Sequence, residues 1–301
     1  MVKSNILITG SSGFVGKNLT HKLSEKDYNF TKLSLRKNDW VKELRQADVS
    51  TYIHLAGIAH DVAKVNDDKI YYDVNYELTK KLYNCFLKDE KADKFIFFSS
   101  VKGAADQPIQ ILMEDVKPSP KTAYGKSKLM AENYILDNLP AVKKVFILRP
   151  CMIHGAGNKG NLNLLYNFIA KSFPYPFGNF NNRRSFVSID NVCFIINELI
   201  RDENIKSGIY NIADDESLST VDLVKTIGEA MHKNPRIFDI PKPIIHLIAK
   251  TGDVLPLPIN SERVQKLTEN YVVSNEKIRK AIKKDLPLTA IDGIRKTITS
   301  F

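Results

Sequence analysis

The amino-acid sequence predicts a doubly wound α/β fold, with a parallel sheet covered by helices on both faces and a smaller C-terminal cap. Three observations predict it. Short apolar runs without polar alternation recur through the first half of the chain, as in strands that are buried on both faces. Helical patterns separate these runs, which is the order of βαβ units. A glycine-rich turn follows the first run directly.

Strands and helices are expected to alternate through the first half of the chain. A helix is expected over residues 14–26, and a longer one over residues 67–88. In the longer helix, apolar residues recur every four positions from Ile70 to Phe86, so one face can pack on the sheet. The apolar runs that predict strands cover residues 5–9, 30–35, 51–57, 93–100 and 143–150.

The second half differs in composition and predicts the cap. Glycine, asparagine and proline crowd the segments after Pro150, and helical patterns dominate from Val221 onward. No internal repeat or low-complexity linker separates the two halves. We therefore expect a sheet domain over residues 1–155 and mainly a cap over residues 156–301, with segments near 186–215 returning to the sheet.

The charge balance is basic and its residues are scattered. The chain of 301 residues has 44 Lys and Arg against 34 Asp and Glu, a formal net charge of +10. Such an excess suits an anionic ligand such as a nucleotide, and also nucleic acid or an anionic membrane surface. A lysine-rich solvated surface is the simplest explanation. Because the chain has no nucleic-acid-binding motif and no basic stripe, we expect no nucleic-acid partner.

Cysteine usage and hydropathy predict a soluble protein of the reducing cytoplasm. Cys85, Cys151 and Cys193 lie far apart, so neither a disulfide framework nor a metal site is expected. The first apolar run is too short for a signal peptide. No run reaches the roughly 18 apolar residues of a membrane span.

The segment "ITGSSGFVG" predicts a dinucleotide site between the first strand and the first helix. Gly10 permits a tight turn, Gly13 lets the backbone approach a pyrophosphate, and Gly16 lets helix and strand pack closely. The helix N-terminus adds its N–H groups and its partial positive charge. The residues expected to contact the cofactor here are Gly10, Ser12, Gly13, Phe14, Val15 and Gly16.

In the segment "KTAYGKSKLM", Tyr124 and Lys128 are spaced to lie one helical turn apart on one face. Tyrosine is a poor base at its usual pKa of about 10. An ammonium group close to the phenol would favour the phenolate and lower that pKa. The pair could therefore serve as an acid/base, although the spacing alone also fits an ordinary solvated helix.

Six segments in order resemble the extended branch of the short-chain dehydrogenase/reductase superfamily, over essentially the whole chain. They are "TGSSGFVG", "YIHLAG", "FIFFSSVK", "AYGKSKLMAE", "ILRPCMIHGAGNKGN" and "NRRSFVSIDN". The subgroup that they match is UDP-glucose 4-epimerase-like and includes enzymes for bacterial surface-polysaccharide sugars. The resemblance implies a Rossmann fold, an NAD(P) cofactor, a UDP-linked nucleotide-sugar substrate, and a homodimer.

The resemblance also assigns roles near the nicotinamide. Tyr124 would give or take the hydroxyl proton while hydride moves to or from a sugar carbon. Lys128 would lower the pKa of the tyrosine and bond the nicotinamide ribose, and Ser100 rather than Ser99 would donate to the reacting oxygen. Asn75 matches the superfamily's active-site asparagine, the alternative being a helix-capping or water-binding residue. The motif expected beside the adenosine includes Leu55, Ala56 and Gly57.

The residues after Ser100 exclude two of the reactions that relatives catalyse. Val101 and Lys102 stand where nucleotide-sugar 4,6-dehydratases have an aspartate and a glutamate. Relatives that epimerise C3 and C5 have a cysteine after the serine, and none is present here. Redox at a single carbon, C4, is therefore expected. The chain also departs from its subgroup, because the loop after Ser100 is two residues shorter.

The end of the second strand bears on the choice of cofactor. An acid at that position would bond the ribose of NAD, whereas an arginine accommodates the 2′-phosphate of NADP. The strand's end has no acid and is followed by Arg36 and Lys37. We therefore expect NADP. The alternative is NAD, with Asp39 serving the ribose.

Four residues are expected near the nucleotide sugar by resemblance. Asn161 and Arg184 match positions that hold the diphosphate, with Arg183 as a competitor to Arg184. Arg263 matches a second phosphate-binding arginine more loosely. His60 matches a histidine in the loop after the third strand.

The sequence thus favours an NADPH-dependent 4-keto reductase acting on a UDP-linked (N-acetyl)hexose. The alternative is an NAD-dependent UDP-hexose 4-epimerase, which removes and returns the C4 hydride. A non-catalytic NAD(P)-sensing regulator is a distant third, because such proteins usually lack the Tyr/Lys pair.

Overall fold

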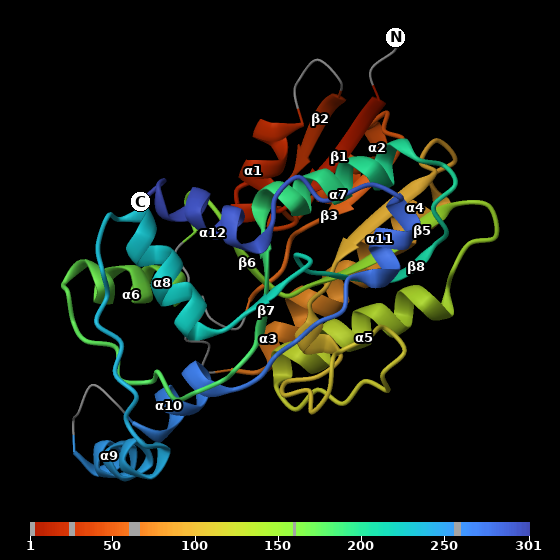
Figure 1. Ribbon diagram of the computed structural model, residues 1–301. Helices are drawn as coiled ribbons and strands as arrows, with labels where there is room; N and C mark the ends of the chain where they lie inside the picture. Colours follow the sequence, from red (N-terminus) through yellow and green to blue (C-terminus); the bar gives the residue numbers. More distant parts are fainter. Residues whose placement is uncertain (1–3, 24–27, 60–66, 159–160, 256–259) are drawn as a thin grey trace.

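A six-stranded sheet forms the centre of the molecule (Figure 1). The computed structural model describes residues 4–23, 28–59, 67–158, 161–255 and 260–301. The sheet order is β2-β1-β3-β4-β5-β8, and every neighbouring pair is parallel. The strands are β1 (Ser4–Thr9), β2 (Tyr28–Leu33), β3 (Thr51–His54), β4 (Lys94–Phe98), β5 (Lys144–Pro150) and β8 (Gly208–Ile212). The predicted doubly wound α/β fold is confirmed.

Two hydrophobic cores lie on the two faces of this sheet, because successive strand residues point to opposite sides. Ile6 and Ile8 enter one core and Leu7, between them, enters the other. The helices of the first core are α1 (Phe14–Lys22), α7 (Ile189–Arg201) and α11 (Glu276–Ile282). Those of the second are α2 (Trp40–Gln46), α4 (Leu78–Lys88) and α5 (Ala123–Asp137). The continuous apolar runs of the sequence reflect this burial on both faces.

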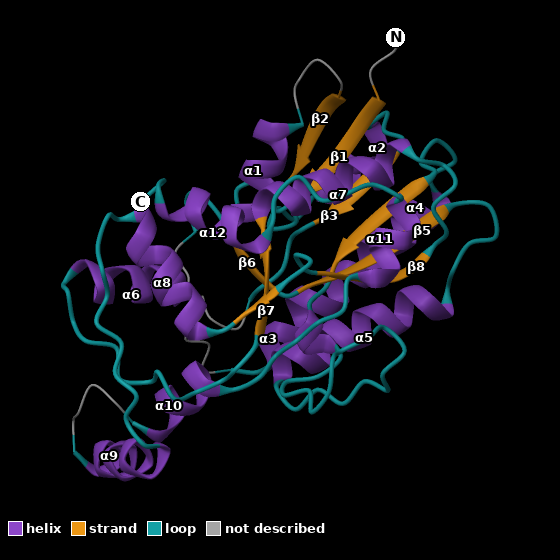
Figure 2. Cartoon of the chain, in the orientation of Figure 1, coloured by secondary structure: helices purple, strands orange, loops and turns teal. Residues whose placement is uncertain are grey.

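A smaller sheet and five helices form the cap (Figure 2). The small sheet has the order β6-β7-β9, with β6 (Met152–His154), β7 (Arg184–Ser188) and β9 (Ser217–Leu218). The helices are α6 (Asn161–Ala170), α8 (Thr220–Ala230), α9 (Lys242–Val254), α10 (Ser261–Thr268) and α12 (Ala290–Ile298). A third core joins these elements. The boundary between residues 155 and 156 stays a prediction.

The segment expected as one helix over residues 67–88 is divided in three. A short helix, α3 (Lys69–Tyr71), continues into a π-helical turn over Tyr72–Glu77, and α4 follows. A π-turn accommodates an extra residue within a helix and often marks a functional site. It contains Asn75, whose side chain is fully buried. The uniform spacing of four in the sequence did not indicate this interruption.

Candidate active site

The glycine loop lies where β1 and β3 leave the sheet side by side, at the point where the strand order reverses. Ligands of open α/β sheets bind in this crevice, outside the carboxyl ends of the strands. Gly10 has a φ of +70°, and a Cβ there would lie 2.6 Å from the backbone nitrogen of Ala56. A Cβ at Gly16 would lie 2.4 Å from the carbonyl oxygen of Gly10. Neither position has space for a side chain.

The rest of the loop leaves the start of α1 open. Gly13 is the N-cap residue of α1, and no side chain caps the helix there. Ser12 and Gly13 are exposed, whereas Phe14 and Val15 pack against the first core. The exposed N–H groups of a helix start, preceded by residues without bulk, can hold a pyrophosphate. The donor set and the space therefore fit a dinucleotide.

The loop after β3 is fastened to β1 through buried polar groups. Leu55 N donates to the Thr9 carbonyl at 3.2 Å, and Ala56 N donates to the Thr9 hydroxyl at 3.3 Å. His54 bonds the hydroxyl groups of Thr9 and Thr79. Burial lowers the pKa of His54 to about 3, so this imidazole is neutral and structural.

Tyr124 and Lys128 lie one turn apart at the start of α5. The Thr122 hydroxyl caps this helix by accepting from Gly125 N. Tyr124 is half-buried, and its ring meets that of Tyr71 edge-on, with 6.1 Å between the centroids. The Lys128 side chain is buried, and its Nζ donates to the Phe98 carbonyl at 2.9 Å.

Lys128 is an ammonium group held in a site that penalises charge. Burial lowers its pKa to about 8, and the nearby Glu132 carboxylate only partly opposes the shift. A Cβ at Gly57 would lie 3.1 Å from Lys128 Nζ and 2.9 Å from Asn75 Oδ1. Gly57 therefore keeps the backbone beside the ammonium group free of bulk.

The Asn75 amide joins three segments of the site. Its Oδ1 accepts from Ile58 N at 2.8 Å, and its Nδ2 donates to the Ile58 carbonyl and the Ser127 hydroxyl, each at 3.1 Å. These bonds tie the loop after β3 to α5, next to Lys128. Because the amide is buried inside a helical segment, it neither caps a helix nor binds bulk water.

The two serines after β4 have different partners. The Ser99 hydroxyl donates to the buried carboxylate of Glu132, which also pairs with Arg149 at 2.6 Å. Ser100 Oγ accepts from Lys102 N at 3.2 Å, which leaves its hydroxyl proton able to donate. The Ser99 hydroxyl is thus bonded within the core, whereas the Ser100 hydroxyl can still donate a hydrogen bond to a ligand.

The loop after Ser100, whose path the sequence left open, is anchored to the start of α5. The Asp106 carboxylate accepts from Lys121 N at 2.6 Å, from Thr122 N at 3.3 Å and from the Thr122 hydroxyl at 3.2 Å. Lys102 Nζ donates to the Asp106 carbonyl at 2.7 Å. A carboxylate at a helix N-terminus satisfies free N–H groups and the helix dipole. Asp106 therefore fixes the loop that follows Ser100 relative to the start of α5, where Tyr124 lies.

Replacing Asp106 by alanine should lower turnover by about 10- to 100-fold, because a small misplacement of Tyr124 is costly. Helix stability should fall by only about 1 kcal/mol. The measurement is kcat and KM for the nucleotide sugar, together with thermal unfolding. Asp253→Ala is the matched control, because the Asp253 carboxylate accepts from Ser261 N and Oγ at the start of α10 in the cap. Equal turnover of the two variants would contradict the positioning role.

The two basic residues after β2 have different environments. Lys37 is exposed and pairs with Glu43 at 2.6 Å, which raises its pKa. Arg36 is exposed as well, and within the described part of the chain its guanidinium makes no ion pair. Of the two, Arg36 is the one available to an anion.

Arg184 is linked to the loop after Ser100 through Tyr271. Arg184 pairs with the Tyr271 backbone and lies 3.5 Å from the Glu269 carboxylate. The Tyr271 hydroxyl donates to the Ala105 carbonyl at 2.6 Å, and its ring lies 4.5 Å from Lys102 Nζ. Burial lowers the pKa of Arg184, and the nearby Glu269 carboxylate opposes this shift. Sequence patterns did not indicate Tyr271 or Glu269, because neither belongs to a recognisable motif.

The structure describes the other predicted substrate-binding residues only in part. Arg183 is exposed and donates to the Ser217 carbonyl at 2.9 Å. Arg263 is exposed on the first turn of α10. Asn161 begins α6, but its side chain lies outside the description. His60 also lies outside the described residues.

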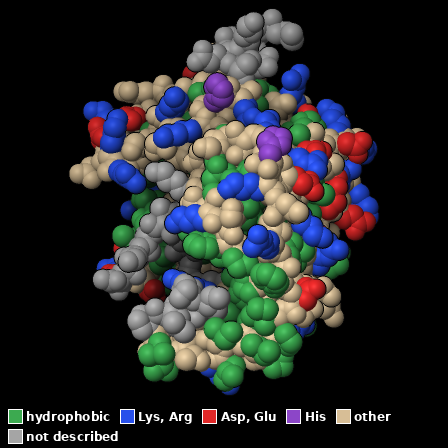
Figure 3. Space-filling view, turned by 60° about the vertical axis from the view of Figure 1, so that its left-hand side comes forward, with side chains coloured by type: hydrophobic (Ala, Val, Ile, Leu, Met, Phe, Trp, Pro, Cys, Tyr) green, Lys and Arg blue, Asp and Glu red, His purple; other side chains and the backbone are tan. Residues whose placement is uncertain are grey.

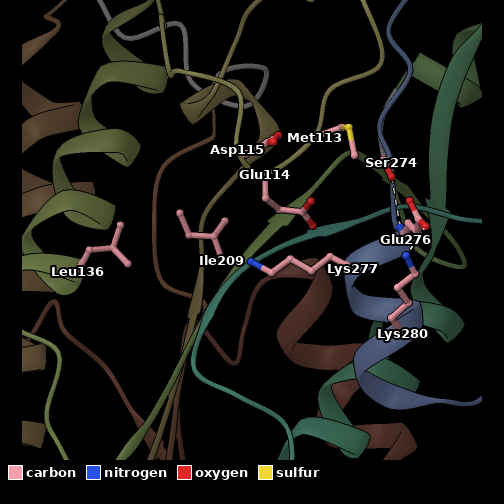
Figure 4. Close-up of a pocket in the computed structure, with 9 residues that line it drawn as sticks. All are labelled: Met113, Glu114, Asp115, Leu136, Ile209, Ser274, Glu276, Lys277 and Lys280. Atoms are coloured by element: carbon pink, nitrogen blue, oxygen red, sulfur yellow. Dashed lines mark hydrogen bonds and ion pairs between the residues drawn. The ribbon is translucent and has the colours of Figure 1, made fainter.

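A pocket of about 600 Å³ lies elsewhere, beside edge strand β8 (Figure 4). Its lining includes Ile209, Leu136, Lys277 and Glu114. Leu136 lies three turns beyond Tyr124 along α5, roughly 18 Å at the rise of a helix. This pocket therefore does not belong to the site at the carboxyl ends of β1 and β3.

Comparisons with known proteins agree with this arrangement. The model of the NAD dependent epimerase/dehydratase family matches residues 6–213. The chain is 28% identical to UDP-glucose 4-epimerase of Vibrio cholerae, over 99% of this chain and 95% of the relative. It is 27% identical to dTDP-4-dehydro-6-deoxyglucose reductase of Escherichia coli, over 77% of this chain and 83% of the relative.

A solved structure shares the fold. RMD from Pseudomonas aeruginosa, complexed with NADPH, superposes with a TM-score of 0.75, covering 99% of this chain and 98% of that one. The two sequences are 18% identical, a level at which the likeness shows the fold alone.

Proposed function

The chain belongs to the NAD dependent epimerase/dehydratase family, and on this premise we propose that it transfers hydride at C4 of a UDP-linked (N-acetyl)hexose. The favoured reaction is NADPH-dependent reduction of a 4-keto sugar for surface polysaccharide. The observation that carries the proposal is the geometry around Lys128. This buried ammonium group lies one turn from Tyr124 and beside the side-chain-free backbone of Gly57.

Each residue of the site has a proposed task in the chemistry. Gly13 and the start of α1 would hold the pyrophosphate of a dinucleotide, which when bound would supply the hydride. The Tyr124 phenol gives its proton to the C4 oxygen, and Ser100 donates a hydrogen bond to that oxygen. The Lys128 ammonium group stabilises the phenolate that remains. Asn75 positions the loop and α5 and needs no contact with the sugar.

The cap supplies the proposed contacts to the substrate diphosphate. Arg184 is charged, half-buried and linked to the loop after Ser100, and this placement suits a bidentate contact to phosphate. Asn161, Arg263 and His60 remain proposed contacts on the strength of the resemblance. We propose a reaction in the reducing cytoplasm, from the three scattered cysteines, and a homodimeric assembly on the strength of the resemblance.

The choice of NADPH rests on Arg36. With no acid at the end of β2, the exposed guanidinium can bind a 2′-phosphate.

Arg36→Ser should weaken NADPH binding by about tenfold or more while changing NADH binding little. Lys37→Ser is the matched control, because Lys37 is already paired with Glu43. Titration of nucleotide-free protein with each dinucleotide gives both affinities, and equal losses in the two variants would contradict the assignment.

A 4-epimerase is the second candidate, and the similarity to UDP-glucose 4-epimerase over nearly the whole chain favours it. The two reactions differ in the fate of the cofactor. Denaturing the purified protein and identifying the released dinucleotide separates them. One equivalent of NAD⁺ would support the epimerase and overturn the role of Arg36. An empty protein that oxidises NADPH only with a UDP-4-keto sugar would support the reductase.

A further inference from the structure

Helix α9 of the cap has a solvent-exposed apolar stripe. Ile244, Leu247 and Ile248 follow the helical spacing of three and four residues. Val254 and Leu255 come two turns further on, seven residues after Leu247 and Ile248, and Leu255 is the C-cap residue. All five side chains are exposed, Leu247 by 68% and Val254 by 85%. A surface helix usually turns its apolar residues toward the core, so this stripe requires an explanation.

A different face of the same helix holds it to the cap. Ile245, Ala249 and Gly252 are buried, and Ile245 and Ala249 belong to the third core. The stripe therefore faces outward from a fixed helix. Phe238, in the segment before α9, is also half exposed. Hydrophobic side chains gather at the lower end of the molecule in Figure 3, the end at which α9 lies in Figure 1.

Basic residues also lie on α9, and one of them borders the stripe. Lys242, His246 and Lys250 are exposed and spaced by four residues, but Lys242 and His246 contact Phe180 of the cap, on a side of the helix away from the stripe. Lys250 borders the stripe, because it comes three residues after Leu247 and four before Val254. The only acid in the helix is Asp253, whose carboxylate accepts from Ser261 N and Oγ.

The surroundings of α9 are basic too. Residues 230–255 contain four lysine or arginine residues but only two acids. The formal net charge of the whole chain is +10. An apolar stripe bordered by Lys250, within a basic segment, complements an anionic lipid surface, where apolar side chains enter the acyl boundary and the lysine meets the headgroups.

We propose that the α9 stripe docks the protein on an anionic membrane surface, with the helix lying in the interfacial plane. No helix among the described residues is long and apolar enough to cross a bilayer, so the helix would lie on the surface. A second copy of the chain is a poorer partner. The stripe is one helix wide and about 16 Å long, well short of the roughly 800 Å² per partner of a stable interface. A two-fold contact through the stripe would also bring Lys250 of both copies to one interface.

Vesicle co-sedimentation of the full-length protein tests this. We expect binding to phosphatidylcholine vesicles that contain phosphatidylglycerol, and little binding to pure phosphatidylcholine. Added salt should weaken the binding. Leu247→Asp should reduce the bound fraction about tenfold, and Lys250→Glu should reduce it by a smaller factor. Both positions are exposed, so the fold should tolerate these changes.

Ile109→Asp is the matched control, because Ile109 is fully exposed and belongs to the loop after Ser100, not to α9. This variant should bind vesicles as the wild type does. Failure of the wild type to bind anionic vesicles, or undiminished binding by Leu247→Asp, overturns the proposal. A dimer in light scattering that Leu247→Asp converts to a monomer, without lipid binding by the wild type, assigns the stripe to a second copy instead.

Discussion

Replacing Tyr124 by phenylalanine should lower turnover of the nucleotide sugar by about 100- to 10,000-fold. The change removes the proton donor and keeps the aromatic ring, so the edge-on contact with Tyr71 can persist. We therefore expect the loss in kcat, with cofactor affinity and thermal stability close to those of the wild type. Stopped-flow absorbance of the reduced dinucleotide, at saturating substrate, measures the effect.

Tyr134→Phe is the control for this experiment, because Tyr134 lies on the same helix. Its hydroxyl donates to Asn84 Oδ1 at 2.7 Å, away from the start of α5. We expect this variant to turn over substrate at nearly the wild-type rate. A Tyr124→Phe enzyme as fast as wild type would remove Tyr124 from the acid/base role. The acid/base would then have to come from another group near C4.

The fold was predictable because its signals are local. Each buried strand carries a continuous apolar run, since both of its faces meet a core, and a glycine turn follows the first strand. These features lie within a few residues of one another. The family resemblance, confirmed by the match over residues 6–213, rests on the same kind of short ordered segment.

The features that were missed depend on contacts between distant segments. The π-turn over residues 72–77 turns Asn75 toward Ile58 and Ser127, and the helical spacing alone does not reveal it. Tyr271 lies 166 residues from Ala105, the residue whose carbonyl it bonds. Such partners become visible only when the chain is folded.

The loop after Ser100 illustrates the same limit. Comparison with the subgroup showed that two residues are missing, but it gave no path for the chain. In the structure, the shortened loop is held by the Asp106 carboxylate at the start of α5. An aspartate in a loop has many potential partners, so its sequence position alone did not single it out.

Lys128→Met should abolish turnover and, at pH 7, stabilise the nucleotide-free protein by about 1–3 kcal/mol. The wild-type ammonium group is buried, and burial lowers its pKa from 10.5 to about 8. Methionine fills similar space without a charge to desolvate, and the lost bond to the Phe98 carbonyl offsets part of the gain. Urea unfolding of both proteins measures the difference.

The pH dependence of this difference has a definite sign. Between about pH 8 and pH 10.5, the unfolded wild-type chain keeps the Lys128 proton that the folded protein has released. The wild type therefore gains stability with rising pH in this window, and the advantage of the variant shrinks.

Lys94→Met is the control, because Lys94 is buried but paired with Glu203, far along β4 from Ser100. It should leave turnover intact and give no stabilisation. A Lys128→Met protein less stable than wild type at pH 7 would show that the ammonium group supports the fold, so that selection for stability alone could retain it. A more stable but inactive variant would mean that the lysine is retained for its role in catalysis, although it lowers the stability of the protein.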